Sequence, residues 1–241
     1  MPTPFFSIIV PTYNRARLLD RALESVLAQH ESSWELLVAD DGSTDGTWAA
    51  LCDWTRRDDR VRCWRHANRG QAATRNALLE RARGNWVAFL DSDDELLPDH
   101  LALRRKAITE LPATQLWLAP MRIVGNPLVP CCVHPGEMIH IDHCLGVGML
   151  TIRREAILQA GGFPEIGYAE DSALMRRLLA SGMRIGRLTQ RSYVYHRSHV
   201  DSVTSNQVAA NDIIKAAHLA ESRLRPTGNL HRNAGAGIGM A

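Results

Sequence analysis

Apolar runs that read as buried strands alternate with segments of helical periodicity through the first 120 residues. The strand-like runs are residues 5–10, 34–39, 61–64, 86–90 and 116–119. Between them apolar residues recur three and four positions apart, which predicts helices over residues 18–27, 48–54, 71–83 and 98–111. Parallel strands covered on both faces are apolar almost throughout. The alternation therefore predicts an α/β fold with a mostly parallel central sheet, right-handed crossovers and helices on both faces.

The pattern is less regular after residue 120. Prolines and histidines interrupt residues 122–145, which we interpret as an irregular loop or as short edge strands. The elements expected beyond it are a strand over 144–152, helices over 154–160 and 171–180, a strand over 192–196 and an amphipathic helix over 208–224. The glycine-rich tail from residue 226 has few large apolar groups, and we expect it to be disordered or loosely attached.

Composition excludes several classes of protein. With 45% hydrophobic and 22% charged residues, the chain is neither wholly disordered nor collagen-like nor a coiled coil. It has no run of 18 apolar residues, so we expect no membrane-spanning helix, and its first residues lack the basic segment of a secretion signal. Its five cysteines form no C-x-x-C pair, which favours a reducing, cytosolic setting without a disulfide framework or a structural zinc site.

The net charge of +2 is too small to indicate a nucleic-acid partner, but the charges are unevenly distributed. Residues 1–183 carry 20 basic and 23 acidic groups, whereas residues 184–241 carry 8 basic and 3 acidic groups. Two interpretations of the basic C-terminal segment are open: contact with phosphates or an anionic membrane surface, or an ordinary solvated surface.

Acidic residues directly follow two of the predicted strands. Asp40 and Asp41 follow the second strand, and residues 91–94 (Asp-Ser-Asp-Asp) follow the fourth. Ligands of open parallel sheets bind beyond the carboxyl ends of the strands, where clustered carboxylates repel one another unless a cation compensates. Mg²⁺ and Mn²⁺ prefer oxygen ligands and often bring phosphates, so the pattern predicts a metal–nucleotide site. The alternative is that such acids only cap helices and turns, and we favour it for Asp45.

A further acidic pair, Glu170 and Asp171, follows a glycine-containing turn at the start of a predicted helix. Taken together, seven segments resemble the family 2 glycosyltransferases, which are inverting enzymes with the GT-A fold. The segments read, in order, SIIVPTYN, VADDGSTD, NRG followed by TRN, FLDSDD, GGF, ED and RSHVDS. The resemblance covers about residues 5–205, and it implies a single Rossmann-like domain.

The resemblance assigns the nucleotide to the first part of the chain. The end of the first strand would flank the base, Asp41 would accept a hydrogen bond from a base N–H, and Arg75 would lie near the nucleotide. A carboxylate that faces an imide N–H favours uracil or thymine over cytosine, which lacks that donor, so a UDP-sugar is the default donor. The nucleotide-binding residues implied in this way are Pro11, Thr12, Tyr13, Asp40, Asp41, Arg75, Asp91 and Ser92.

The resemblance also implies a divalent metal, Mn²⁺ or Mg²⁺, that bridges the donor diphosphate. Asp93 would bind the metal, and Asp94 is an additional candidate ligand. His199 matches the metal-binding histidine of the family, with His196 as its rival. Asp171 would be the general base that takes the proton of the acceptor hydroxyl. The helix after Asp171 lacks the family's usual aromatic residue, which leaves the identity of the acceptor open.

The sequence thus predicts an inverting, metal-assisted transfer of a sugar from a nucleotide-diphosphate sugar to an acceptor hydroxyl. Residues 1–120 would form the nucleotide-sugar half, residues 121–205 the acceptor and catalytic half of the same domain, and residues 206–241 a helix and flexible tail. The acceptor would be a carbohydrate, a lipid-linked sugar or a small molecule. We expect a cytoplasmic enzyme, and peripheral membrane contact through its basic segment stays one of the two open interpretations of that segment. The alternatives are a non-catalytic nucleotide-sugar-binding module and a sugar nucleotidyltransferase.

Overall fold

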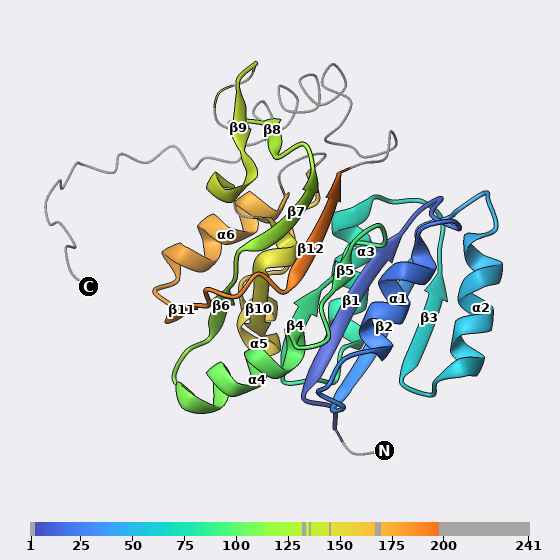
Figure 1. Ribbon diagram of the computed structural model, residues 1–241, viewed down its shortest axis with the longest axis horizontal. Helices are drawn as coiled ribbons and strands as arrows, with labels where there is room; N and C mark the ends of the chain where they lie inside the picture. The colour runs from blue at the N-terminus through green and yellow to red at the C-terminus, as the bar shows by residue number, and fades with distance from the viewer. Residues whose placement is uncertain (1–2, 132–133, 135, 145, 167–169, 198–241) are drawn as a thin grey trace, which may run out of the picture.

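The computed structural model describes residues 3–131, 134, 136–144, 146–166 and 170–197 (Figure 1). The strands are β1 (Phe6–Thr12), β2 (Trp34–Asp40), β3 (Val61–Arg65), β4 (Trp86–Phe89), β5 (Glu95–Leu96), β6 (Leu116–Leu118), β7 (Met121–Gly125), β8 (Leu128–Pro130), β9 (Met138–His140), β10 (Leu150–Arg153), β11 (Ile185–Arg187) and β12 (Tyr193–Arg197). The helices are α1 (Leu19–Leu27), α2 (Thr47–Arg57), α3 (Gln71–Arg81), α4 (His100–Glu110), α5 (Arg154–Gln159) and α6 (Glu170–Ala180), with 3₁₀ turns η1 (Ile141–His143) and η2 (Val147–Met149). None of the helices in this part of the chain is long and apolar enough to cross a membrane.

A seven-stranded sheet runs through the molecule in the order β11-β6-β10-β4-β1-β2-β3. Strand β10 is antiparallel to β4 and β6, and the other neighbouring strands pair in parallel. This arrangement confirms the predicted mostly parallel α/β sheet. Because β1, β2 and β4 run in the same direction, their carboxyl ends meet at one edge of the sheet, toward which the arrowheads of β1 and β2 point in Figure 1.

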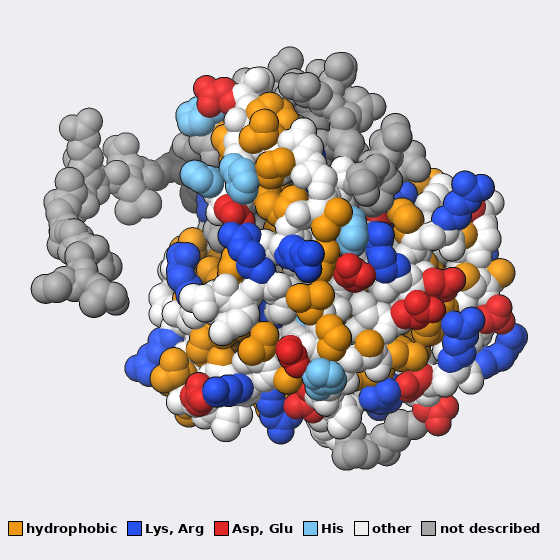
Figure 2. Space-filling view, in the orientation of Figure 1, with side chains coloured by type: hydrophobic (Ala, Val, Ile, Leu, Met, Phe, Trp, Pro, Cys, Tyr) orange, Lys and Arg blue, Asp and Glu red, His pale blue; other side chains and the backbone are white. Residues whose placement is uncertain are grey.

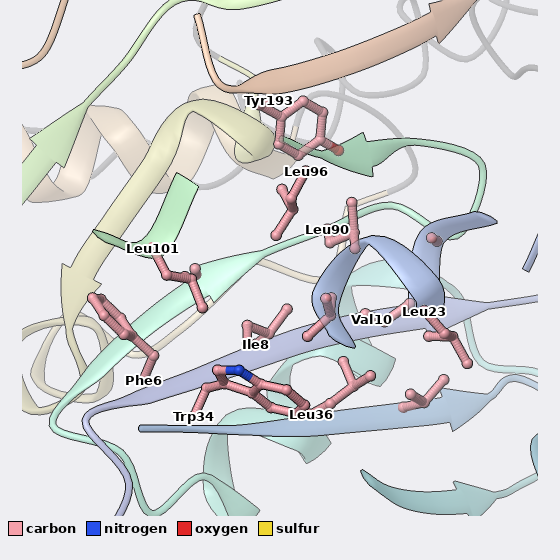
Figure 3. Packing of buried hydrophobic residues seen from close by; sticks show 14 of the residues in the cluster. Phe6, Ile8, Val10, Leu23, Trp34, Leu36, Leu90, Leu96, Leu101 and Tyr193 are labelled. Carbon is pink, nitrogen blue, oxygen red and sulfur yellow. The ribbon is translucent and has the colours of Figure 1, made fainter. Parts of the chain in front are cut away.

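Alternate side chains of β1 enter hydrophobic clusters on opposite faces of the sheet. Phe6, Ile8 and Val10 pack with Leu36 of β2 and with side chains of α1, α2 and α4 (Figure 3). Ile9 belongs to the second cluster, which includes side chains of α3, α5 and α6. Every residue of β1 and of β2 is buried. The helices therefore cover both faces of the sheet, which explains why these strands are apolar along most of their length.

The chain after residue 120 adds shorter strands beside the main sheet. Strand β12 lies between β5, to which it is antiparallel, and β7, to which it is parallel. Strands β8 and β9 form a separate antiparallel pair, so residues 122–145 contain the short strands of our second interpretation. The strand predicted over 144–152 is shorter in the structure, where it is β10, because the 3₁₀ turn η2 precedes it. Strand β11 was not predicted, since its three residues show no alternation of apolar and polar side chains. The predicted helix over 208–224 and the glycine-rich tail lie outside the described residues.

Two local contacts bring motif residues into place. Asp45 accepts a hydrogen bond from the backbone N–H of Thr47 at 2.9 Å, at the start of α2, as its capping interpretation predicts. Asn76 of α3 accepts from the N–H of Phe163 and donates to its carbonyl, both at 2.8 Å. Gly162 has a φ of +66°, and a Cβ there would lie 2.5 Å from the Asn76 side chain. Glycine is therefore required where this turn is fastened to α3.

Candidate active site

A cavity of about 1070 Å³ opens at the carboxyl edge of β1, β2 and β4. One wall consists of the loops after these strands and the start of α3, and the other comes from β7 through the start of α6 and from β12. Asp93 and Asp171 must meet at one cleft if the predicted chemistry is correct, and both line this cavity. A concave site of this size beyond the strand ends suits a nucleotide-sized ligand.

The loop after β1 forms the part of the cavity predicted to hold the base. Pro11, Thr12 and Tyr13 all line it. Thr12 is buried, and its Oγ1 has no hydrogen-bond partner within the described part of the chain. A ligand polar group would remove the free-energy penalty of such an unpaired hydroxyl. Asn14, with a φ of 51°, fixes the loop because its Oδ1 accepts from the N–H of Thr44 at 2.9 Å.

The two aspartates after β2 have different surroundings. Asp40 does not line the cavity: it is buried, its Oδ1 accepts a backbone N–H from the next turn, and its Oδ2 lies 3.2 Å from Arg65 Nε. Asp41 lines the cavity, and its two oxygens accept from the backbone N–H groups of Arg69 and Gly70, both at 2.9 Å. A carboxylate has about four acceptor positions. Asp41 therefore retains acceptor positions that a ligand N–H can use.

Arg75 of α3 connects the two walls of the cavity. It is only 2% exposed, and it donates to Asp91 Oδ1 and to Glu170 Oε1, both at 2.8 Å. Burial alone lowers the pKa of its guanidinium, but the carboxylates of Asp91, Glu170 and Asp171 raise it above its ordinary value. Arg75 therefore stays charged and neutralises acids that come from both parts of the chain. The sequence predicted a basic residue near the nucleotide and did not reveal these carboxylate partners.

The acid loop, residues 91–94, follows β4 and is closed by a hydrogen bond of 3.0 Å from the N–H of Asp94 to the carbonyl of Asp91. All four of its residues border the cavity. The side chains of Asp91 and Asp93 are 26% and 18% exposed. Arg15, in the loop after β1, approaches Asp93 with its Nε 3.7 Å from Oδ2. The wall formed by the loops after β1, β2 and β4 thus places a basic side chain beside the predicted metal ligand.

Asp94 differs from the other acids of this loop because it is fully buried. Its Oδ2 accepts from the hydroxyl of Tyr193 at 2.6 Å, and its Oδ1 accepts from the backbone N–H of His196 at 2.8 Å. Burial and the charges of Asp91 and Asp93 raise the pKa of Asp94 well above its ordinary value. Both oxygens of this carboxylate are therefore engaged with β12.

The donor set at the cavity fits a hard cation that binds through few protein ligands. Asp91 and Asp93 offer carboxylate oxygens, and Mg²⁺ is often held by one or two carboxylates, with phosphate and water completing its coordination. No group of three or more metal-ligating side chains occurs among the residues that the structure describes. His199 lies outside them, and its rival His196 is directed to Glu95, with Nε2 3.1 Å from Oε1.

Asp171 lies at the start of α6 on the cavity wall, and its Oδ1 accepts from the N–H of Ser172 at 2.7 Å. Burial and the charge of Glu170 raise the pKa of Asp171 to about 7, although Arg75 and the Ser172 N–H oppose this shift. A general base is most effective when its pKa is near the working pH. Glu170 is instead paired with Arg75, so the two adjacent acids have different surroundings.

Several residues of the cavity were not predicted. Gln71 donates to Asp91 Oδ1 at 3.2 Å, and Arg15 approaches Asp93. Arg15 directly follows the first motif, and this position could have predicted that its side chain lies at the cavity. Tyr193 also lines the cavity, but a single tyrosine in a short strand gives no indication of such a role.

Comparison with known proteins agrees with this geometry. Residues 7–128 match the sequence model of Glycosyl transferase family 2. The chain is 34% identical over 187 residues to TuaG of Bacillus subtilis, a glycosyltransferase named for teichuronic acid biosynthesis. This match covers 74% of this chain and 73% of TuaG. It is 30% identical over 178 residues to WfgD of Escherichia coli, named a UDP-Glc:alpha-D-GlcNAc-diphosphoundecaprenol beta-1,3-glucosyltransferase. That match covers 72% of this chain and 69% of WfgD.

Among solved structures, S. aureus TarS 1–349 in complex with UDP-GlcNAc superposes with a TM-score of 0.71 and 26% identity. The match covers 83% of this chain and 60% of that one, so the chain spans less than two thirds of the TarS structure. The sheet and its cavity thus define a domain of the GT-A class of glycosyltransferases. The chain belongs to glycosyl transferase family 2, and it is a nucleotide-sugar-dependent enzyme rather than a binding module or a nucleotidyltransferase.

Proposed function

We propose that the enzyme transfers a sugar from a UDP-sugar to an acceptor hydroxyl with inversion at the anomeric carbon. The observation that carries this proposal is that Asp171, whose pKa is about 7, lines the same cavity as Asp93. A single displacement needs a proton acceptor on one side of the sugar and charge stabilisation of the leaving group on the other. Asp171 and the acid loop supply these two functions from opposite parts of the chain.

In the proposed step, Asp171 accepts the proton of the acceptor hydroxyl. The hydroxyl oxygen forms a bond to the anomeric carbon while the bond from that carbon to the diphosphate oxygen breaks, and UDP leaves with the electron pair. Attack from the face opposite the leaving group inverts the configuration. Because Arg75 opposes the effects of burial and of Glu170 on the pKa of Asp171, a useful fraction of this carboxylate is ionised near neutral pH.

The donor assignment rests on the part of the cavity that the first strands form. Asp41 has acceptor positions for the imide N–H of uracil, and the unpaired hydroxyl of Thr12 lies on the same wall. Tyr13, which is 44% exposed, offers a ring that can stack on the base. The complexes of TarS with UDP-GlcNAc and with UDP support a uridine nucleotide, as does the donor in the name of WfgD.

We assign the metal, Mn²⁺ or Mg²⁺, to Asp93, with Asp91 near the ribose or a metal-bound water. When bound, the cation offsets the negative charge that grows on the departing diphosphate. His199 remains the proposed C-terminal ligand. We also propose that Ser92 contributes to binding the nucleotide. A mannosyltransferase of the same fold from Pyrobaculum calidifontis was solved with GDP-Man and Mn²⁺.

The acceptor and the location of the enzyme are proposals of broader scope. TuaG is named for teichuronic acid biosynthesis and the name of WfgD includes a diphosphoundecaprenol acceptor, so a lipid-linked or cell-surface glycan is the acceptor class that we propose. A cytoplasmic location agrees with Cys52, Cys63, Cys131 and Cys144, which are free thiols. Peripheral membrane contact through the basic C-terminal segment is the corresponding proposal for how the enzyme reaches such an acceptor.

A screen of nucleotide sugars tests the reaction and the donor together. Thermal-shift measurements and the slow release of nucleoside diphosphate are compared for UDP-, GDP-, dTDP- and CDP-linked sugars, each with Mn²⁺, Mg²⁺ or a chelator. We expect the largest stabilisation and the fastest release for a UDP-sugar with a divalent cation. A preference for GDP or CDP donors contradicts the assignment of Asp41, and the same release rate in the chelator contradicts the metal.

A further inference from the structure

The acid loop is attached to β12 by contacts that its metal-binding role does not use. The hydroxyl of Tyr193 accepts from the N–H of Asp91 at 3.2 Å and donates to Asp94 Oδ2 at 2.6 Å. The other oxygen of Asp94 accepts from the N–H of His196 at 2.8 Å. We call the side chains of Asp94 and Tyr193, together with this N–H, the loop clamp. It joins segments that are about 100 residues apart in the sequence.

The surrounding core fixes the loop clamp in place. Asp94 has no exposed surface, and Tyr193 is 1% exposed. The tyrosine ring packs so closely on Gly148 that a Cβ at this position would lie 2.5 Å from the ring. On another side the ring lies near His100, with 6.3 Å between the ring centroids. Because the ring cannot move without disturbing this packing, its hydroxyl is a rigid point of attachment for the loop.

The clamp holds the acid loop at its first and last residues. Asp91 is held by its N–H and Asp94 by its side chain, and the hydrogen bond from Asp94 N–H to the Asp91 carbonyl closes the turn between them. Ser92 and Asp93 therefore lie between two fixed points. Asp93 is partly exposed at the cavity, whereas Asp94, the same residue type one position later, is turned into the core.

We infer that Asp94 and Tyr193 are positioning residues, which hold the acid loop so that Asp93 presents its carboxylate to the metal–diphosphate. This inference revises our sequence-based expectation that Asp94 is itself a metal ligand, and it rests on the proposed function. Binding sites lose affinity when supporting contacts allow the direct ligands to move. The loop clamp therefore acts on nucleotide binding mainly through the cation.

The substitution Tyr193→Phe removes the hydroxyl and keeps the ring against Gly148. We expect it to lower the affinity for UDP in the presence of Mn²⁺ by on the order of tenfold, the range seen when contacts behind a metal ligand are lost. Affinity for UDP without metal should change much less, whereas a general loss of structure would lower both affinities alike. Ser192→Ala is the matched control: it removes the hydroxyl of the residue just before β12, which accepts from Arg104 at 3.0 Å and does not touch the acid loop. This control should lower thermal stability without changing the effect of Mn²⁺.

A double-mutant cycle with Asp93→Ala decides whether the clamp acts through Asp93. We expect Tyr193→Phe to have no further effect on Mn²⁺-dependent UDP binding once Asp93 is absent. An undiminished effect in that background overturns the inference, as does an unchanged Mn²⁺ effect in Tyr193→Phe alone. Should Tyr193→Phe fail to fold, Asp94→Asn serves instead, because its single amide oxygen retains at most one of the two hydrogen bonds. If the wild-type enzyme does not bind UDP at all, the proposed function fails first, and the two failures are distinguishable.

Discussion

The parts of the molecule before and after residue 120 build the cavity in different ways. In the first part, β1 and β2 are buried along their whole length, and the residues at their ends form the wall. In the second part the strands are short and partly exposed, and hydrophobic side chains gather over β7–β9 at the top of Figure 2. Exposed apolar residues in this region are Val124, Leu128 and Met138.

The chemical character of the two walls differs as well. The described lining of the first part includes the basic side chains of Arg15, Arg69 and Arg75, which suit a diphosphate. The described lining of the second part includes no arginine or lysine, and it combines acids with apolar side chains such as Met121 and Val129. The difference agrees with the proposed division of roles, in which the ends of the long parallel strands bind the nucleotide, whereas the short later elements supply the general base and the surroundings of the acceptor.

Removing the proposed general base, Asp171, should have the largest effect on turnover. This substitution tests the contribution of the second part of the molecule alone. We expect Asp171→Asn to lower turnover by about 10²–10⁴-fold while UDP binding is retained. Because the pKa of Asp171 is raised in the folded state, stability falls as pH rises from its unfolded pKa to about 7. The neutral variant should therefore be at least as stable as the wild type at pH 8. Kinetics, calorimetry with UDP and thermal unfolding measure these outcomes, and near-normal turnover rejects the assignment.

Removing Arg75 should affect both parts together. The substitution Arg75→Met leaves the carboxylates of Asp91 and Glu170 without their buried cation, and we expect a loss of about 3 kcal/mol in the free energy of unfolding. Arg81→Met is the matched control, since this exposed arginine lies on the same helix. Chemical denaturation measures both variants. Equal and small losses would mean that Arg75 does not join the two walls.

Removing the predicted metal ligand should affect only the first wall. We expect Asp93→Ala to eliminate the Mn²⁺ enhancement of UDP affinity, a loss on the order of 100-fold or more if a direct ligand matters at least as much as its supporting contacts. Asp53→Ala, on the exposed surface of α2, is the control. Calorimetry with and without Mn²⁺ measures the effect, and an unchanged metal dependence rejects Asp93 as a ligand.

The pH profile of the reaction tests whether Arg75, in the first part of the chain, tunes the pKa of Asp171, in the second. Turnover requires ionised Asp171, so kcat/KM should rise as pH increases and level off above an apparent pKa of about 7. Arg75 lowers the pKa of Asp171, and Arg75→Lys, which places the cation less well, should move this limb to higher pH. A limb in the ordinary range of aspartate, near pH 4, contradicts the proposed base.

The smallest effect on catalysis is expected at the opposite edge of the sheet. Glu35, near the start of β2, is 1% exposed and accepts from Ser7 Oγ at 2.7 Å and from Arg83 N and Nε at 2.6 and 2.8 Å. Although burial raises its pKa, the hydrogen bonds and charge of Arg83 and the Ser7 hydroxyl bring it below the ordinary value. Its contribution to stability is thus present above the unfolded pKa of glutamate and is lost as pH falls through the folded one.

We therefore expect Glu35→Gln to lower the free energy of unfolding by about 1–3 kcal/mol at pH 7 and to leave turnover unchanged. The difference in stability from the wild type should shrink as pH falls from the unfolded pKa of glutamate through the lower folded pKa of Glu35, because the wild-type carboxylate is progressively protonated over this range. A pH series of denaturation curves measures this difference. A comparable loss of turnover would show that the two edges of the sheet are coupled.

The sequence by itself determined the strands and acids of the first part, because their signals are local. Four of the five residues from Phe6 to Val10 are apolar, Asp41 directly follows β2, and Asp93 lies in the loop just after β4. Local hydrophobic pattern and position in the sequence were therefore sufficient to predict them. The antiparallel direction of β10 and the three-residue strand β11 carry no comparable pattern. Tertiary contacts assigned them to the sheet.

Only the tertiary structure decided which of several identical residue types does what. Asp93 and Asp94 are adjacent aspartates, yet the side chain of Asp93 is partly exposed, whereas that of Asp94 is fully buried and bonded to Tyr193, about 100 residues away in the sequence. Asp40 and Asp41 diverge in the same manner. The physical reason is that the partner of a buried charge is supplied by another element of the fold, and no local pattern encodes which one it will be.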